Sequence, residues 1–145
     1  MAKVELKRRS STTTRKALKK RSKAKLSALK RKLWQRFSTY IKERDNYTCF
    51  TCNRKGEGAG MHAGHYIPDA VGGVALRYDE RNVHAQCFHC NINLGGYGAM
   101  YHKKMVEKYG NLVVERLWKL KNQITKDFDY QKKLDYYDQL RNRRG

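Results

Sequence analysis

The sequence predicts an α+β fold in which a short hairpin closed by cysteines is flanked by N-terminal and C-terminal helices. All four cysteines fall into two C-x-x-C pairs, Cys49 with Cys52 and Cys87 with Cys90, with 34 residues between the pairs. Apolar residues recur at helical spacing before the first pair and after the second. The intervening segment is rich in glycine and contains two short stretches that favour strands. These observations place a small sheet between helical extensions.

The cysteine pairs favour a metal centre. Two C-x-x-C motifs can present four thiolates tetrahedrally, which is the arrangement that Zn²⁺ prefers in closed sites. Two disulfides or four unconnected thiols are the alternatives. The N-terminus is basic and lacks the apolar core of a secretory signal, which favours reduced, metal-bound thiols in a cytoplasm. Four thiolates leave no open position for water, so we expect this zinc to be structural.

The charge balance indicates a polyanionic partner. The chain holds 33 Lys and Arg against 13 Asp and Glu, a formal net charge of +20. Such a charge is typical of nucleic-acid binding, and less often of binding to an anionic membrane surface. No apolar run approaches the roughly 18 residues that a membrane span needs. Residues 1–36 contain 15 Lys and Arg and a single acid, so most of the excess charge lies at the N-terminal end.

The pattern along the chain divides it into a tail and one domain. Residues 1–22 are basic and poor in large apolar groups, which predicts a disordered tail. Residues 23–145 form the predicted domain. A helix should run from residue 23 to about residue 45, with Leu26, Leu29, Leu33 and Phe37 on one face. A short strand is expected over residues 65–67, a return strand from residue 82, and helices near residues 90, 100–109, 111–124 and 127–140.

Four polar residues of the hairpin are candidates for chemistry. His62 and His65 lie three residues apart in a glycine-rich segment, Asn82 begins the return strand, and Asn91 directly follows the last cysteine. A cysteine-closed hairpin would bring all four within plausible reach of one another. A histidine pair of this kind can be a metal-ligand or acid–base pair, or it can be purely structural.

Several short motifs between residues 40 and 117 resemble the phage NinG (Rap) family. They are Cys49-x-x-Cys52, Ala63-Gly64-His65-Tyr66, Leu76-Arg77-Tyr78, Glu80-Arg81-Asn82-Val83-His84, and Gln86-Cys87-x-x-Cys90-Asn91. The arrangement also resembles the HNH, or ββα-metal, nucleases. Among these it is most similar to phage endonuclease VII, in which an asparagine likewise follows the last zinc cysteine.

The resemblance implies a role for each candidate. His65 matches the histidine that activates water, Asn82 the residue that pins the hairpin and orients that histidine, and Asn91 a ligand for a catalytic Mg²⁺ or Mn²⁺. His62 occupies a position where the resembling proteins typically carry Asp. Imidazole is a softer ligand than carboxylate, so His62 as a ligand would favour Mn²⁺ and other transition metals over Mg²⁺.

The resemblance also implies a function: a metal-dependent endonuclease acting on branched DNA such as Holliday junctions, in phage recombination. It implies a homodimer, because symmetric cutting of a junction needs two active sites, and a cytoplasmic location in the bacterial host. The alternatives are an HNH nuclease for ordinary duplex DNA and a non-catalytic zinc module that binds DNA. Candidate contacts to DNA phosphates are Arg31, Lys32, Arg36, Arg77 and Arg81.

Overall fold

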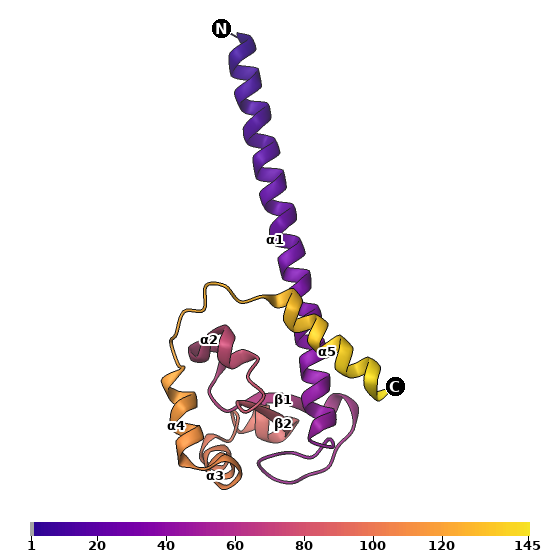
Figure 1. The fold of residues 1–145 in the computed structure, drawn as a ribbon, viewed down its shortest axis with the longest axis vertical. Helices are drawn as coiled ribbons and strands as arrows, with labels where there is room; N and C mark the ends of the chain where they lie inside the picture. The colour runs from indigo at the N-terminus through magenta and orange to yellow at the C-terminus, as the bar shows by residue number, and fades with distance from the viewer. Residues whose placement is uncertain (1) are drawn as a thin grey trace.

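The computed structural model describes residues 2–145, with side chains from residue 12 onward, and its fold is α+β. A two-stranded antiparallel sheet lies beside the lower part of a long N-terminal helix (Figure 1). The elements in order are α1 (Ala2–Arg44), η1 (Gly58–Gly60), β1 (Met61–His65), α2 (Asp69–Arg77), β2 (Val83–Cys87), η2 (His89–Asn93), α3 (Gly98–Tyr109), α4 (Asn111–Lys119) and α5 (Tyr130–Arg144).

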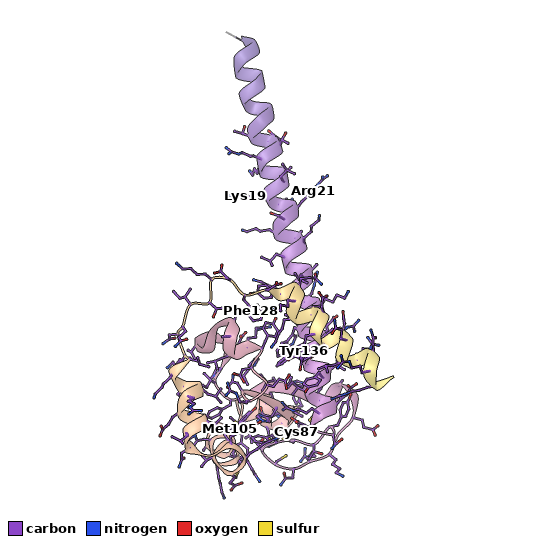
Figure 2. All side chains as sticks on the ribbon, viewed as in Figure 1. Lys19, Arg21, Cys87, Met105, Phe128 and Tyr136 are labelled. Carbon is purple, nitrogen blue, oxygen red and sulfur yellow. The ribbon has the colours of Figure 1, made fainter. Side chains whose placement is uncertain are left out.

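Helix α1 is continuous from Ala2, where the sequence predicted a disordered tail up to residue 22. The upper half of the helix projects away from the rest of the protein, and Lys19 and Arg21 lie on this projecting part (Figures 1 and 2). Residues 12–28 are exposed throughout. Lys, Arg, Ala and Leu favour helix intrinsically, so the helix that packs below can propagate upward without an apolar face of its own. Within the described residues, no helix is long and apolar enough to cross a membrane.

The lower half of α1 forms the first hydrophobic core with α5. Leu33, Phe37 and Ile41 are fully buried and pack against Leu134 and Tyr137 of α5. Their spacing of four residues places them on one face of α1, as the sequence predicted. The same cluster includes Tyr78 and Val83, so it continues onto one face of the hairpin.

The second core lies on the other side of the hairpin. Tyr101 and Met105 of α3 pack against Val114 and Leu117 of α4, together with Ile67 and Leu76. Gly110 separates the two helices with a φ of 82°, a conformation that glycine adopts without steric cost, so the break expected between the helices 100–109 and 111–124 is confirmed. Helix α4 ends at Lys119, five residues earlier than expected, and α5 begins at Tyr130.

The register of the hairpin determines which way each of its side chains points. His62 pairs with Gln86 and His65 with Val83. Successive side chains on a strand alternate between its two faces. His62 and Gly64 therefore share one face with Gln86 and His84, whereas Ala63 and His65 share the α1 face with Val83 and Ala85.

The strand predicted over residues 65–67 begins four residues earlier and ends at His65. It does not continue to Ile67, because the amide of Ile67 donates to the Asn82 side chain at 2.8 Å and not to a ladder partner.

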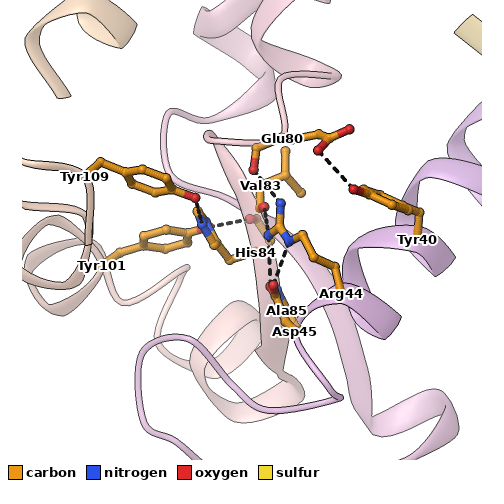
Figure 3. A network of polar contacts seen from close by, with 10 residues as sticks. Tyr40, Arg44, Asp45, Glu80, Val83, His84, Ala85, Tyr101 and Tyr109 are labelled. Atoms are coloured by element: carbon orange, nitrogen blue, oxygen red, sulfur yellow. Dashed lines mark hydrogen bonds and ion pairs between the residues drawn. The ribbon is translucent and has the colours of Figure 1, made fainter. Parts of the chain in front are cut away.

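The end of α1 is tied to β2 by a charged residue pair (Figure 3). The Arg44 guanidinium donates to the carbonyl oxygens of Glu80 and Val83 at 2.7 and 2.9 Å, and its Nε donates to Asp45 at 2.7 Å. Asp45 also accepts from the amide of Ala85 at 2.8 Å. Because the first cysteine follows four residues after Asp45, these contacts position the first knuckle against the strand that leads to the second.

Candidate functional site

The four cysteines converge on one point. Their Sγ atoms all lie within 4.8 Å of one another, and the Sγ atoms of Cys52 and Cys87 are 3.7 Å apart. A tetrahedral site with Zn–S bonds of about 2.3 Å requires sulfur–sulfur distances of about 3.8 Å. The cluster therefore fits a four-thiolate zinc ion. Three of the cysteines are buried and Cys52 is exposed, so the centre sits at the edge of the hairpin.

Backbone contacts hold the two knuckles in place. The amide of Phe50 donates to the carbonyl of Ala85 at 2.8 Å, which links the first knuckle to β2. The amide of Cys90 donates to Cys87 Sγ at 3.5 Å, a contact that stabilises a thiolate. Met61 and Ala85 pack around the cysteines as a small apolar cluster. The predicted metal centre thus also serves as the third core of the protein.

Asn82 is fully buried and fastens the loop between the strands. Its Oδ1 accepts from the amide of Ile67 at 2.8 Å, and its Nδ2 donates to the carbonyl oxygens of Ile67 and Leu76 at 3.1 and 3.0 Å. These three hydrogen bonds give both the oxygen and the nitrogen of the buried Asn82 amide partners inside the protein. They also hold the end of α2, where the carbonyl of Arg77 faces His65.

His65 lies at the end of β1 with one ring nitrogen engaged. Its Nε2 is 3.1 Å from the carbonyl oxygen of Arg77. A carbonyl only accepts, so Nε2 carries the proton and the neutral ring has its lone pair on Nδ1. The ring stacks on Trp34 of α1, with centroids 5.4 Å apart and an interplanar angle of 14°. Burial lowers the pKa of His65 from 6.5, which keeps the ring neutral at physiological pH. Trp34 of α1 thus supports the histidine ring.

His62 and Asn91 lie in contact, as expected for a hairpin that the cysteine pairs close. Nδ2 of Asn91 lies 3.0 Å from Nδ1 of His62. Asn91 belongs to η2, a short π-helix that begins inside the second knuckle and contains Cys90, so the cysteine cluster determines its position. Alternation along β1 places His62 on the opposite face from His65. The structure therefore brings the candidates together as two pairs, His62 with Asn91 and His65 with the loop that Asn82 fastens.

The five residues predicted to contact DNA phosphates differ in whether a carboxylate of the protein already pairs with them. Three of the five arginine and lysine side chains already pair with a carboxylate: Arg36 with Asp138 at 2.7 Å, Arg81 with Asp79 at 2.8 Å, and Arg77 with Asp69. Arg31 and Lys32 are exposed on α1. Arg31 lines a groove of about 510 Å³ whose wall includes Lys30, Trp34, Arg77 and Tyr130. Trp34 stacks on His65 and the Arg77 carbonyl accepts a hydrogen bond from it, so this basic groove adjoins the histidine.

His84 is a buried titratable group without a role in the predicted chemistry. Its Nδ1 is 3.0 Å from the Tyr101 hydroxyl and its Nε2 is 2.8 Å from the Tyr109 hydroxyl. It also stacks on Phe50, with ring centroids 4.0 Å apart. Burial, aided by the positive charges of Arg44 and Lys108, lowers the pKa of His84 to about 2. The folded protein therefore holds this ring neutral.

This burial predicts a loss of stability in mild acid. Below the unfolded-state pKa near 6.5 the unfolded chain binds a proton that the folded protein excludes, so the free energy of unfolding should fall by about 1.4 kcal/mol per pH unit. Urea unfolding of the zinc-loaded protein at pH 7.5, 6.5 and 5.5 measures the slope. His84→Gln should reduce the loss of unfolding free energy between pH 6.5 and pH 5.5 by about 1 kcal/mol. The exposed His102→Gln is the control, and an equal slope in all three proteins would contradict this assignment.

The fold and the cysteine cluster define a small α+β protein built on a hairpin whose four cysteines could hold a metal ion. A family model described as "Bacteriophage Lambda NinG protein" matches residues 1–143, and the chain belongs to this family. It is similar to protein ninG of Salmonella phage P22 (34% identical over 84 residues, covering 57% of this chain and 40% of the relative). It is also similar to protein ninG of Escherichia phage lambda (30% over 120 residues, covering 77% and 56%). The chain spans about half the length of the curated relatives it matches. No solved structure matches it.

Proposed function

We propose that this protein is a metal-dependent DNA endonuclease of the HNH type that acts on branched DNA in phage recombination. The observation that carries the proposal is His65: its Nε2 is fixed by the Arg77 carbonyl, its Nδ1 holds the free lone pair, and a basic groove lies beside it. Among residues 12–145, whose side chains are described, Nδ1 has no hydrogen-bond partner. A neutral imidazole oriented in this way can take a proton from an attacking water.

Asn91 is the residue that would hold the catalytic cation, with His62 beside it. Apart from the four cysteines, the described residues contain no converging group of three or more His, Cys, Asp and Glu side chains. The site is thus poor in charged ligands, which suits an ion whose remaining positions are filled by water and phosphate oxygens. When bound, a divalent cation supplies positive charge that stabilises the scissile phosphate and the departing 3′ oxygen.

A nicking assay tests the proposal. Zinc-loaded protein is incubated with a four-way junction or with linear duplex of the same sequence, in the presence of Mg²⁺ or Mn²⁺. Cleavage of the junction in preference to the duplex supports the full proposal, and equal cleavage supports an HNH nuclease for ordinary duplex DNA. Paired, symmetric incisions would support the homodimer that two-site cutting needs.

A second candidate function is a non-catalytic zinc module that binds DNA. One observation favours it: His65 and the His62–Asn91 pair lie on opposite faces of β1. Binding of junction DNA with no cleavage under any divalent metal would select this alternative.

The projecting half of α1 should contribute to DNA affinity through charge alone. Lys16, Lys19 and Lys20 are exposed on this segment. The logarithm of the DNA-binding constant falls as the logarithm of the salt concentration rises. Replacing all three lysines by Gln should make this slope less steep, by up to about 0.9 for each DNA phosphate that a lysine no longer neutralises. Cleavage at saturating DNA should change little. Fluorescence anisotropy at several salt concentrations measures the slope.

The control for charge removal is a variant in which Lys103, Lys119 and Lys126 are replaced by Gln. These lysines are exposed, in α3, at the end of α4 and in the segment after α4. Both variants remove three positive charges. If the two slopes fall equally, the projecting helix makes no special contact with DNA.

A further inference from the structure

Gln86 has a buried oxygen atom without a partner. Its side chain lies on β2 directly across from His62 and is fully buried. Oε1 accepts no hydrogen bond from any residue whose side chain the structure describes. An unpaired buried acceptor costs roughly 1–3 kcal/mol, so its retention calls for a ligand or a function.

The orientation of this amide is determined by its other end. Nε2 donates to the carbonyl oxygen of Gly96 at 2.9 Å and to Thr51 Oγ1 at 3.2 Å. A carbonyl oxygen cannot donate, so the nitrogen must face Gly96 and the oxygen must face the opposite way. Oε1 therefore points toward Gly64 on the neighbouring strand.

Gly64 has no side chain, and the Gln86 amide occupies the space where its Cβ would stand, with a second oxygen at the edge of that space. A Cβ on Gly64 would overlap Gln86 Oε1 and would stand 3.1 Å from Asn91 Oδ1. Two amide oxygens, from β2 and from η2, thus approach the same point. Asn91 is turned this way because its Nδ2 faces His62 Nδ1 at 3.0 Å.

We propose that Gln86 Oε1 is a ligand of the catalytic cation, which it shares with Asn91 Oδ1 above Gly64. This inference rests on the proposed function and adds a residue to its metal site. His62 then acts as a positioning residue that holds Asn91 by accepting from Nδ2. Amide oxygens are hard ligands, so this site takes Mg²⁺ or Mn²⁺ in preference to Co²⁺ or Ni²⁺, the reverse of the order expected with His62 as a ligand.

Paramagnetic broadening by Mn²⁺ tests the site without relying on cleavage. Substoichiometric Mn²⁺ is added to the zinc-loaded full chain labelled with ¹⁵N. The backbone amide of Gly64 and the side-chain NH₂ groups of Gln86 and Asn91 should broaden first. The amides of Lys19 and Arg21, on the projecting part of α1, should keep their line widths. Mg²⁺ should then shift the same signals and reverse the broadening by competition.

Gly64→Ala and Gly60→Ala form a matched pair of variants. A Cβ on Gly64 would displace Gln86 Oε1, whereas a Cβ on Gly60 meets nothing within 4 Å. Mn²⁺ binding, measured by the electron paramagnetic resonance signal of free ion, should weaken at least about tenfold in Gly64→Ala only. Gln86→Met keeps most of the side-chain volume and should weaken binding equally. Thermal unfolding of each variant, with zinc retained, shows whether it is folded.

The outcomes separate this inference from the proposed function. If Mn²⁺ leaves the Gly64 and Gln86 signals unchanged, or if folded Gln86→Met binds Mn²⁺ like wild type, the inference is overturned, even when the enzyme cleaves DNA. Broadening confined to His62 would overturn it as well and support His62 as the ligand. If the signals broaden but no DNA is cut, the cation site stands and the endonuclease proposal fails.

Discussion

Replacing Cys87 with Ser should remove the bound zinc and unfold the hairpin. Structural zinc sites contribute about 10–16 kcal/mol of apparent binding free energy in small peptides. This matches or exceeds the roughly 5–15 kcal/mol that stabilises a whole domain. Cys87 lies at the end of β2, fixes the second knuckle and packs in the cluster that contains Met61 and Ala85. Loss of one thiolate should therefore abolish the whole cluster.

The loss should be confined to one part of the protein. The core between α1 and α5 is built from Leu33, Phe37, Ile41, Leu134 and Tyr137, and none of these residues belongs to the cysteine cluster. Hydrogen exchange should show the amides of β1 and β2 losing protection in Cys87→Ser while the amides of α1 near Phe37 keep theirs. Metal analysis should find one zinc per chain in the wild type and none in the variant.

Cys52→His is the matched control. Cys52 is the exposed cysteine of the four, so an imidazole has room there and can complete a Cys₃His site. This variant should retain zinc and keep the hairpin protected. A Cys87→Ser protein that keeps its zinc, or that loses it without any change in exchange, would show that the cysteines do not hold a structural metal.

The sequence was most informative where a motif determines geometry by itself. The spacing of Cys49, Cys52, Cys87 and Cys90 predicted a convergent cluster, and the structure places the four sulfurs together. The helical spacing of Leu29, Leu33 and Phe37 predicted the buried face of α1, whereas Leu26 of the same predicted face is exposed. Both features depend on local periodicity, which the sequence displays directly. The proximity of His62 and Asn91 followed from the convergence of the cysteines, since it brings β1 and η2 together.

The sequence could not determine the register of the hairpin. A strand beginning at His65 gives no information on how His62 is oriented, and only the pairing of His62 with Gln86 shows that the two histidines point to opposite faces. For the same reason Gln86 was given no role, although it stands in the motif Gln86-Cys87-x-x-Cys90-Asn91: what a neutral amide beside a cysteine contacts is not known until its strand neighbour is known. The stacking of Trp34 on His65 joins residues 31 positions apart and was likewise hidden. Residues 1–22 looked disordered because their composition lacks an apolar face, whereas helix propagation from below depends only on backbone propensity.

His65→Ala should lower cleavage by about 10²–10⁴-fold, the range for removal of a general base, while DNA affinity stays near that of wild type. The reason is the state of its ring: Nε2–H donates to the Arg77 carbonyl and Nδ1 remains free to accept a proton. The pH profile provides an independent readout. Since burial lowers the pKa of His65 below 6.5, wild-type cleavage should stay constant at neutral pH and decline only in acid, as the ring becomes protonated. The residual activity of the variant should lack this decline.

A double variant tests whether the two faces of the hairpin serve one reaction. His65→Ala and Asn91→Ala should each damage cleavage severely, and in a shared active site the double variant should lose little more than the worse single variant, because groups that act as a unit are non-additive. Losses that multiply would indicate independent contributions from the two faces. His102→Ala is the control, since His102 is an exposed histidine outside the hairpin whose Nδ1 lies 2.6 Å from the Tyr66 hydroxyl. Wild-type rates for His65→Ala, with the acidic decline unchanged, would exclude His65 as the base and leave the His62–Asn91 face as the remaining candidate for chemistry.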